Sequence, residues 1–245
     1  MLQVEGRNPV YESLKTARPA KILVSEKSRE DPKIQQIIDL ARKLKTPIEF
    51  VETSKLNRIS ETKRHQGVIA LVKSPKQASI DQILSTGEED LCVLLLDRVQ
   101  DPMNLGSILR TAQATGVNGV VVPKKGGVGI TPTVLRASMG AGLRIPVAKA
   151  SLYQAVKLLK REGAKIIGVD PSGTVEYHDE RLTGSLALVL GGEGRGISPT
   201  LLDKCDSVVR IPMEGNIESL NVGVAAAVVL YERMRQQKHE GEEHR

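Results

Sequence analysis

From residue 91 onward, short unbroken apolar runs alternate with segments whose apolar residues recur at helical spacing. The apolar runs predict buried strands at 92–96, 119–122, 146–148, 165–169, 185–190 and 208–211. The segments between them predict helices at 104–115, 132–139, 151–162, 199–204 and 219–236. Strands without polar alternation, separated by helices, indicate a parallel sheet that is covered on both faces. We therefore expect an α/β fold whose ligands bind at the carboxyl ends of the strands.

The first 72 residues carry a second, smaller α/β pattern. Asn8 and Pro9 predict the cap and first turn of a helix, and Asp31-Pro32 predicts the start of another. Strands are predicted at 21–25, 47–51 and 66–72, with a short helix at 54–60. The polar stretch 73–90 is typical of a linker. The pattern thus predicts a small domain at 1–73, a linker at 74–90 and a large domain at 91–245.

Charge is distributed unevenly over these two parts. The chain of 245 residues is 40% hydrophobic, which is enough for such cores, and its formal net charge is +6. Residues 1–75 hold 15 Lys or Arg and 9 Asp or Glu, whereas residues 76–245 hold 20 of each. The whole basic excess therefore lies in the small domain, which favours this domain as the part that attracts a nucleic acid. The alternative is that these cations only solvate a small domain.

Several other classes of protein and site are disfavoured. No apolar run approaches the ~20 residues that span a bilayer, and the N-terminus lacks a basic-then-apolar leader, so we expect a cytoplasmic protein without a membrane partner. Cys92 and Cys205 lie in segments predicted to be regular structure, where we expect buried, free thiols. The four histidines are scattered without metal-ligand spacing, so no metal is predicted.

The predicted strand 185–190 ends in a glycine-rich loop. Four glycines between positions 191 and 196 surround the charged side chains of Glu193 and Arg195. The spacing fails the dinucleotide fingerprint G-x-G-x-x-G because Ile197 and Pro199 occupy its last position, and no Walker A loop is present. A purely structural turn is the alternative. Charges set between glycines nevertheless favour a loop whose backbone approaches a ligand closely.

The predicted strand 208–211 leads through a turn into a helix rich in alanine and valine, which the pattern starts at Ser219. Ser219, Leu220 and Asn221 would then lie at a helix N-terminus, where free backbone N–H groups favour an anionic or polar ligand. Ser219 could equally be a simple N-cap. The helix is apolar almost all round, which predicts burial inside the protein or against a second subunit.

A third polar constellation lies on the predicted helix 104–115. Asn104 and Arg110 are six residues apart, nearly two turns, and lie toward one side of that helix. A guanidinium stays protonated in nearly all protein environments, so Arg110 suits gripping a phosphate better than removing a proton. Asn104 could instead cap the helix after Pro102.

Together, the motifs Asn104–Ala112, Leu186–Ser198 and Val208–Glu232 resemble, in their order, the signature motifs of the SpoU family of RNA ribose 2'-O-methyltransferases. The resemblance spans roughly residues 91–237 and implies S-adenosyl-L-methionine (AdoMet) as the cofactor. By resemblance the cofactor-binding residues are Gly191, Gly192, Gly194, Gly196, Ile211, Met213 and Leu220. By resemblance the catalytic residues are Asn104, Arg110, Glu193, Ser219 and Asn221.

The start of the chain carries a shorter likeness. Gly6–Leu14 and His65–Ala70 resemble the smaller substrate-binding domain of family members that methylate guanosine in ribosomal RNA. This implies an L30e-like fold for the small domain. For the large domain the family implies a C-terminal trefoil knot from about Leu186, which periodicity alone would not predict because true knots are rare. The family is also homodimeric, with the active site completed across the subunit interface.

The resemblance assigns a role to each catalytic position. Asn104, Ser219 and Asn221 would orient Arg110 and the substrate, and Glu193 would hold the motif loops or the substrate ribose. The leading hypothesis is AdoMet-dependent methylation of a guanosine in 23S ribosomal RNA or a large-subunit precursor. The alternatives are a transfer-RNA ribose methyltransferase, a non-catalytic RNA-binding protein and a nicotinamide dehydrogenase. A non-catalytic protein would be expected to lose the five catalytic residues, and the dehydrogenase lacks its fingerprint.

Overall fold

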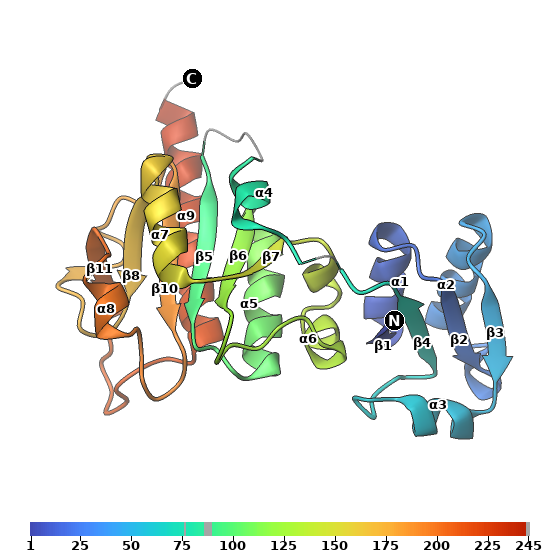
Figure 1. The fold of residues 1–245 in the computed structure, drawn as a ribbon. Coiled ribbons are helices and arrows are strands. Elements are labelled where there is room, and N and C mark those ends of the chain that lie inside the picture. The colour runs from blue at the N-terminus through green and yellow to red at the C-terminus, as the bar shows by residue number, and fades with distance from the viewer. Residues whose placement is uncertain (76, 86–89, 244–245) are drawn as a thin grey trace. The chain divides into compact units, whose positions relative to one another are not determined.

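A computed structural model describes residues 1–75, 77–85 and 90–243 (Figure 1). Packing divides the chain into two compact units. The N-terminal unit comprises 1–76 and 130–144, and the C-terminal unit comprises 77–129 and 145–245. Residues 130–144 join the N-terminal unit because Leu135 is part of its core. Part of the stretch expected as a linker packs in the C-terminal unit, where Ile83 is fully buried.

The N-terminal unit is a small sheet with helices on both faces. Its elements are β1 (Leu2–Glu5), α1 (Arg7–Thr16), β2 (Lys21–Ser25), η1 (Glu26–Ser28), α2 (Pro32–Lys43), β3 (Ile48–Val51), α3 (Thr53–Ile59), β4 (Val68–Val72), α6 (Pro132–Ala137) and η2 (Ala141–Leu143). The strand order is β1-β4-β2-β3, with β2 and β3 parallel and the other pairs antiparallel. Along β2, Ile22 and Val24 face the core with α1 and α2, whereas Leu23 packs with Leu56 of α3. The predicted α/β sandwich is therefore confirmed.

Two local expectations in this unit are wrong. Helix α1 begins at Arg7 after Gly6, whose φ of 96 suits only glycine, so Asn8 lies inside the first turn and does not cap it. Strand β1 was not predicted, because four residues are too few to show a period. In contrast, Asp31 caps α2 as predicted, accepting hydrogen bonds from the backbone N–H groups of Lys33 and Ile34.

His65 is held as a neutral ring between two polar partners. Its Nε2 lies 2.8 Å from Oδ1 of Asn57, and its Nδ1 accepts a hydrogen bond from the backbone N–H of Gly67 at 3.0 Å. Burial lowers the pKa of His65 below 6.5, against a smaller opposing effect of Glu5. Protonation would place a second hydrogen against the N–H of Gly67, so the fold favours the uncharged imidazole.

We expect the N-terminal unit to lose stability in mild acid. Because the pKa of His65 is lower in the folded than in the unfolded chain, the unfolded chain binds the proton first, and stability is lost as pH falls below about 6.5. Amide hydrogen exchange of residues 1–75 in the full chain should therefore accelerate between pH 7.5 and 5.5, after correction for the intrinsic rate. His65→Gln should flatten this dependence. An unchanged profile in that variant would contradict the assignment.

The C-terminal unit is built on a seven-stranded parallel sheet. Its elements are α4 (Ile80–Leu84), β5 (Cys92–Asp97), α5 (Pro102–Ala114), β6 (Gly119–Pro123), β7 (Val147–Ala150), α7 (Leu152–Arg161), β8 (Lys165–Val169), β9 (Val175–Glu176), β10 (Leu186–Gly191), α8 (Pro199–Leu202), β11 (Ser207–Arg210) and α9 (Val222–Glu243). Among the described residues the strand order is β7-β6-β5-β10-β8-β11-β9, with every pair parallel. The predicted parallel sheet is confirmed, although the two-residue strand β9 was not predicted.

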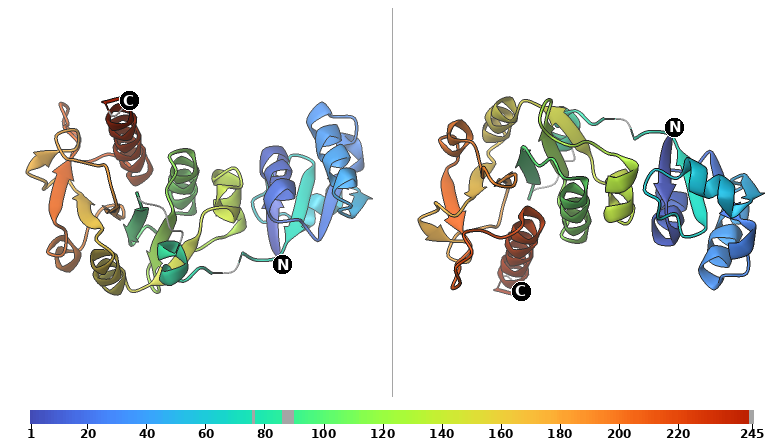
Figure 2. Two further views of the ribbon diagram at one scale, coloured as in Figure 1. Left: turned by 90° about the horizontal axis from the view of Figure 1, so that it is seen from above. Right: turned by 90° about the horizontal axis from the view of Figure 1, so that it is seen from below.

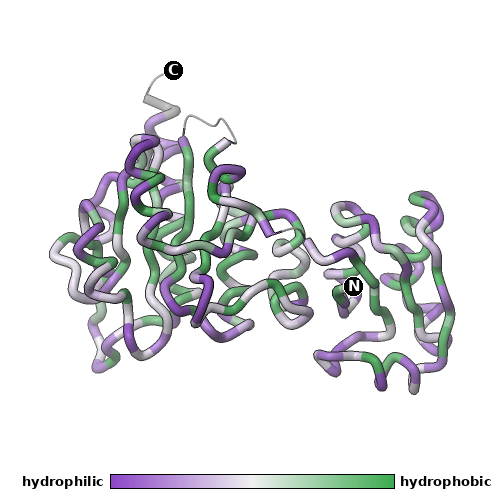
Figure 3. Tube along the Cα trace, in the orientation of Figure 1, coloured by the Kyte–Doolittle hydropathy of each residue, from purple (hydrophilic) through white to green (hydrophobic). Residues whose placement is uncertain are grey.

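Helices cover both faces of this sheet. Figure 2 shows α5 and α9 on one face and α4 and α7 on the other. Val93 and Leu95 of β5 pack in the core that α7 closes, and the alternation along the strand turns Leu94 and Leu96 toward α5 and α9. Figure 3 shows the matching hydrophobic colour along the central strands. Burial on both faces explains why these strands are apolar without alternation.

Both cysteines are free thiols, but only Cys92 is buried as predicted, since Cys205 is partly exposed. Cys92 lies in β5, whereas Cys205 lies in the turn after α8 and so is not in regular structure as expected. Burial raises the pKa of each thiol to about 11, so both are neutral at pH 7 and poor nucleophiles. Among the described helices, none combines the length and hydropathy needed to cross a membrane.

Candidate active site

A cavity of about 660 Å³ opens at the carboxyl ends of β8, β10 and β11. It is lined by residues 169–172, 190–196, 211, 213, 218–222 and 225. This is the edge of a parallel sheet where ligands bind, and the volume is in the range of small-molecule sites. All seven predicted cofactor-binding residues line it, as do Glu193, Ser219 and Asn221.

The glycines from the last residue of β10 onward are required because the loop folds back on itself. A Cβ on Gly191 would lie 2.0 Å from the carbonyl carbon of Gly196, and one on Gly192 would lie 2.2 Å from the carbonyl oxygen of Arg98. Gly194 and Gly196 have φ values of 75 and 58, which disfavour other residues. The glycine-rich loop is therefore a structural turn, which was the alternative interpretation. The same turn forms a wall of the cavity.

Two aspartates that the sequence analysis missed hold this loop in place. The buried carboxylate of Asp97 accepts a hydrogen bond from the backbone N–H of Ser198 at 2.8 Å, and its carbonyl oxygen accepts one from Gly192 at 2.7 Å. The carboxylate of Asp170 accepts from the N–H of Ile197 at 3.3 Å. Both residues stand where a buried strand ends, which is the signal that could have identified them.

The polar start of α9 differs from its prediction. The helix begins at Val222, and Asn221 caps it by accepting hydrogen bonds from the N–H groups of Gly223 at 2.9 Å and Val224 at 3.4 Å. Ser219 is therefore not the N-cap, and it lies with Leu220 in the preceding loop against the cavity. Asn221 caps the helix in place of Ser219 because a hydrogen bond to a residue on α5 also holds its side-chain amide.

That partner is Asn104. The Nδ2 of Asn221 donates to Oδ1 of Asn104 at 2.9 Å, which joins the first and third motifs. Asn104 is 8% exposed and lies in the first turn of α5, whose cap is Asp101, accepting from the N–H of Met103. The alternative of Asn104 as a helix cap is therefore wrong. Asn104 acts at the cavity only through Asn221, since it does not line the cavity itself.

The structure does not place Arg110 at the cavity that Glu193 and Arg195 line. Arg110 is exposed on α5, is not among the residues that line the cavity, and makes no ion pair or hydrogen bond with any described residue. Glu193 and Arg195 are exposed at the cavity and likewise have no polar partner in the described parts of the chain. These three groups are free to meet a substrate or a second subunit.

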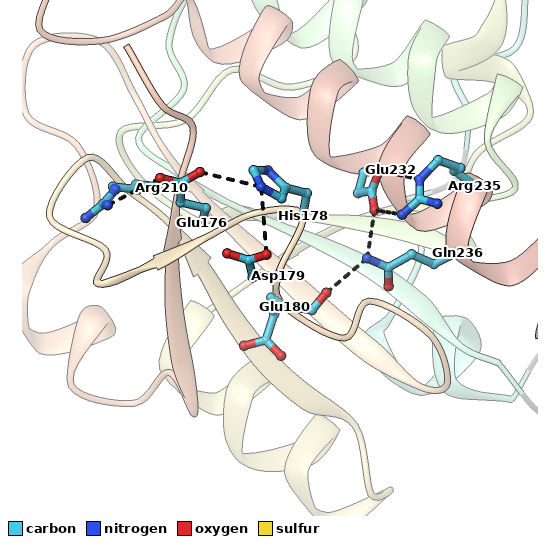
Figure 4. A network of polar contacts seen from close by, with 8 residues as sticks. All are labelled: Glu176, His178, Asp179, Glu180, Arg210, Glu232, Arg235 and Gln236. Carbon is cyan, nitrogen blue, oxygen red and sulfur yellow. Dashed lines mark hydrogen bonds and ion pairs between the residues drawn. The ribbon is translucent and has the colours of Figure 1, made fainter. Parts of the chain in front are cut away.

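A separate group of polar side chains lies at the sheet edge, beside the place where Nε2 of Gln236 on α9 donates to the carbonyl oxygen of Glu180 at 3.0 Å (Figure 4). His178 Nε2 lies 3.5 Å from a carboxylate oxygen of Glu176 and 3.8 Å from one of Asp179, so this histidine is less isolated than its sequence spacing indicated. Glu176, His178 and Asp179 each offer one atom that could bind a metal ion, and these atoms lie within 4.8 Å of one another. Glu176 also pairs with Arg210 at 3.4 Å, and the other two side chains are exposed. We assign this group of side chains to holding the edge of the sheet.

Comparison with known proteins identifies the family. The model of the SpoU rRNA Methylase family matches residues 90–231. The chain belongs to the SpoU family. A second model, for RNA 2'-O ribose methyltransferase substrate binding, matches residues 3–78. This SpoU protein is 38% identical over 98% of its length to YacO of Bacillus subtilis (strain 168), provisionally named a TrmH family tRNA/rRNA methyltransferase, and covers 97% of that protein.

Two solved structures share the arrangement of the SpoU chain. AviRb from Streptomyces viridochromogenes, solved in complex with AdoMet, matches with a TM-score of 0.80 and 26% identity over 96% of this chain and 90% of AviRb. An RNA 2'-O ribose methyltransferase matches with a TM-score of 0.81 and 28% identity over 96% and 88% of the two chains. The predicted fold class and the predicted enzyme class, an RNA ribose 2'-O-methyltransferase, are confirmed. The dehydrogenase alternative is set aside.

Proposed function

We propose that this SpoU enzyme uses AdoMet to methylate the ribose 2'-hydroxyl of a guanosine in 23S ribosomal RNA or its precursor. The observation that carries the choice of RNA is the N-terminal unit. It matches a substrate-binding domain, and residues 1–75 hold the whole basic excess of the chain. A large folded RNA offers an extended array of phosphates to such a unit. The proposal implies the cytoplasm, where ribosomes are assembled.

The cavity of the C-terminal unit fits the proposed cofactor. Its volume suits a nucleoside-sized ligand, and its wall of glycine backbone lets main-chain groups approach closely. Bound AdoMet supplies an electrophilic methyl group. We assign its binding to the backbone at Gly191, Gly192, Gly194, Gly196, Ile211 and Leu220, with the thioether side chain of Met213 at the rim.

The polar residues of the three motifs divide the remaining tasks. Arg110 grips the phosphate beside the target ribose and stabilises the oxyanion that emerges as the hydroxyl loses its proton. Ser219 and Asn221 orient the substrate at the cavity, and Asn104 fixes the amide of Asn221 through the bond between them. Glu193, exposed at the cavity, receives the substrate ribose.

A homodimer would complete this site, because Arg110 does not line the cavity of its own chain. Helix α5 packs against α9, and their outer surfaces expose Met103, Val224 and Tyr231, which are between 49% and 51% exposed. These apolar side chains suit burial against a second copy. Sedimentation at micromolar concentration should give a dimer, and a pure monomer would exclude a site shared between subunits.

Two experiments test the proposed function at different levels. Calorimetry of the purified chain should show AdoMet uptake, and its absence would remove the proposed chemistry. Mapping of ribose methylation in RNA from cells that lack the protein should show one unmethylated guanosine in 23S ribosomal RNA. A missing methyl group in a transfer RNA would instead establish the transfer-RNA alternative.

Asp97→Ala should weaken AdoMet binding roughly tenfold, which corresponds to about 1.4 kcal/mol. The substitution leaves the N–H of Ser198 without its acceptor, and a lost partner of this kind costs about 1–3 kcal/mol. Asp97→Asn retains an acceptor oxygen and should bind within a few-fold of the parent. Calorimetry on both variants is the measurement, and equal losses would show that the hydrogen bond to Ser198 is not what matters.

The domain boundaries at 73 and 91 and the trefoil knot from about Leu186 remain part of this proposal. The knot is favoured by the insertion of β10 between β5 and β8, which are both earlier in the chain. The L30e-like assignment of the N-terminal unit is favoured by its mixed sheet with helices on both faces.

A further inference from the structure

A buried carboxylate that forms no ion pair with any described residue lies at the centre of one loop of the N-terminal unit. Glu5, on β1, is fully buried, and every hydrogen bond it accepts comes from a neutral donor. The hydroxyl of Ser60 and the N–H of Glu61 each lie 2.7 Å from its oxygens, and Thr62 donates through both its N–H and its hydroxyl. We call residues 60–66 the Glu5 loop. A buried charge is tolerated only where such donors are held in place, so the start of this loop is rigid.

The remainder of the Glu5 loop is held in an unfavourable backbone conformation. Lys63 and Gln66 have φ values of 57 and 51, which residues other than glycine rarely adopt. Gln66 is fixed by Arg7, which donates from its backbone N–H to the side-chain oxygen and from Nε to the carbonyl. A Cβ on the next residue, Gly67, would lie 2.2 Å from Oγ of Ser28. Strain of this kind persists where surrounding structure imposes it and often marks a functional surface.

This loop and the end of α3 present cations that the protein does not neutralise. Arg58, Lys63 and Arg64 are exposed, and none forms an ion pair with a described residue, although Lys63 Nζ donates to the carbonyl of Asn57 at 3.1 Å. Arg18, Lys27, Lys43 and Lys45 are also exposed without an ion pair in the described residues, so what distinguishes the three is their position on and beside the Glu5 loop. Other cations of this unit are paired. Lys21 and Lys55 both lie 2.7 Å from Glu49, whose pKa they lower to about 2.

We propose that Arg58, Lys63 and Arg64 form the phosphate-gripping surface of the N-terminal unit. Lys63 and Arg64 lie on the Glu5 loop and Arg58 lies on the adjoining end of α3. Because this backbone is already held in place, little of it has to be ordered when an RNA backbone binds, so the surface can read the spacing of phosphates. The inference rests on the proposed function for the identity of the polyanion. It goes beyond that function by assigning the contact to three residues among the 15 cations of residues 1–75.

The test compares two triple variants with the same change in net charge. Arg58→Gln/Lys63→Gln/Arg64→Gln removes the unpaired cations, and Lys15→Gln/Lys21→Gln/Lys55→Gln removes paired ones. The probe is a 23S ribosomal RNA transcript, and the measurement is the slope of log K against log salt concentration in the full chain. Each lost phosphate contact reduces the slope by roughly 0.7–0.9. We expect a reduction of about 2 for the loop variant and of less than about 0.5 for the paired variant.

Equal salt slopes of RNA binding in the two variants would overturn the proposal. The cations of the loop would then contribute only through the net charge of the protein. Thermal unfolding and AdoMet calorimetry on both variants show whether fold and cofactor site are intact. Failure of the parent protein to bind AdoMet or methylate any RNA would instead refute the proposed function. A parent that methylates RNA while the loop variant keeps its salt slope would refute this inference alone.

Discussion

Replacement of Arg110 by lysine should lower the rate of RNA methylation by roughly 100-fold, with AdoMet affinity unchanged. Lysine keeps the charge but loses the planar fork that binds a phosphate through two parallel hydrogen bonds. Losing one preorganised donor to a transition-state oxyanion costs roughly 10²–10³ in rate. Single-turnover transfer of a labelled methyl group measures the effect. Arg161→Lys, at an exposed position in the last turn of α7, is the matched control and should keep full activity.

Near-full turnover of Arg110→Lys would show that the fork geometry is irrelevant and that the assigned role is wrong. A mixing experiment then locates the arginine. If the site is completed across two subunits, a mixture of Arg110→Ala and Gly191→Ala proteins should regain activity, because a mixed dimer can combine the intact cavity of one chain with the intact arginine of the other. The experiment is run at an AdoMet concentration well below saturation of Gly191→Ala, and a mixture that is no more active than the sum of its two parts would place both groups in one chain.

Gly191→Ala should reduce AdoMet affinity by about 10- to 100-fold. The added methyl group would lie 2.0 Å from the carbonyl carbon and 2.3 Å from the carbonyl oxygen of Gly196, and 2.3 Å from the nitrogen of Ile197. These are backbone atoms, so the loop has to shift and the wall of the cavity shifts with it. Overpacking of this kind costs about 1–3 kcal/mol. Calorimetric titration with AdoMet measures the loss.

Gly215→Ala is the matched control, because no atom lies within 4 Å of its added Cβ and the residue does not line the cavity. It should bind AdoMet within about twofold of the parent. A parent-like affinity in Gly191→Ala would mean that the loop adapts without cost, and the assignment of cofactor contacts to its backbone would fail.

The fold class was predictable because a strand that is buried on both faces consists of apolar residues without polar alternation. Strands β5 and β10 are apolar runs broken only at their last residue, β8 is apolar after Lys165, and these runs predict the sheet. What the pattern could not supply was long-range pairing. The pattern at residues 130–144 predicts an ordinary helical segment of the large domain. Helix α6 nevertheless belongs to the N-terminal unit, because Leu135 is buried in the core of that unit. The other residues of this core lie far from Leu135 in the sequence.

The residues of the candidate site were predictable where the local sequence of a loop decides its conformation. They were not predictable where a hydrogen-bond partner distant in the sequence decides it. The glycines and the residues before α9, which the sequence assigned to a cofactor site, line the cavity. Ser219 and Asn221 are both good caps by composition, and only the bond to Asn104 decides between them. Asp97 directly follows the predicted strand 92–96, and its partner could not be predicted because the N–H of Ser198 that it binds is about a hundred residues away.

The order of strands in the larger sheet bears on how this protein is made. Strand β10 occupies the position between β5 and β8, and β11 occupies the one between β8 and β9, although each is synthesised after both of its neighbours. While the ribosome is still translating codons before 186, the sheet has a gap at its centre and cannot close. The larger sheet can therefore close only after β10 and β11 have been synthesised, and its apolar strand edges are exposed meanwhile to aggregation and to chaperones.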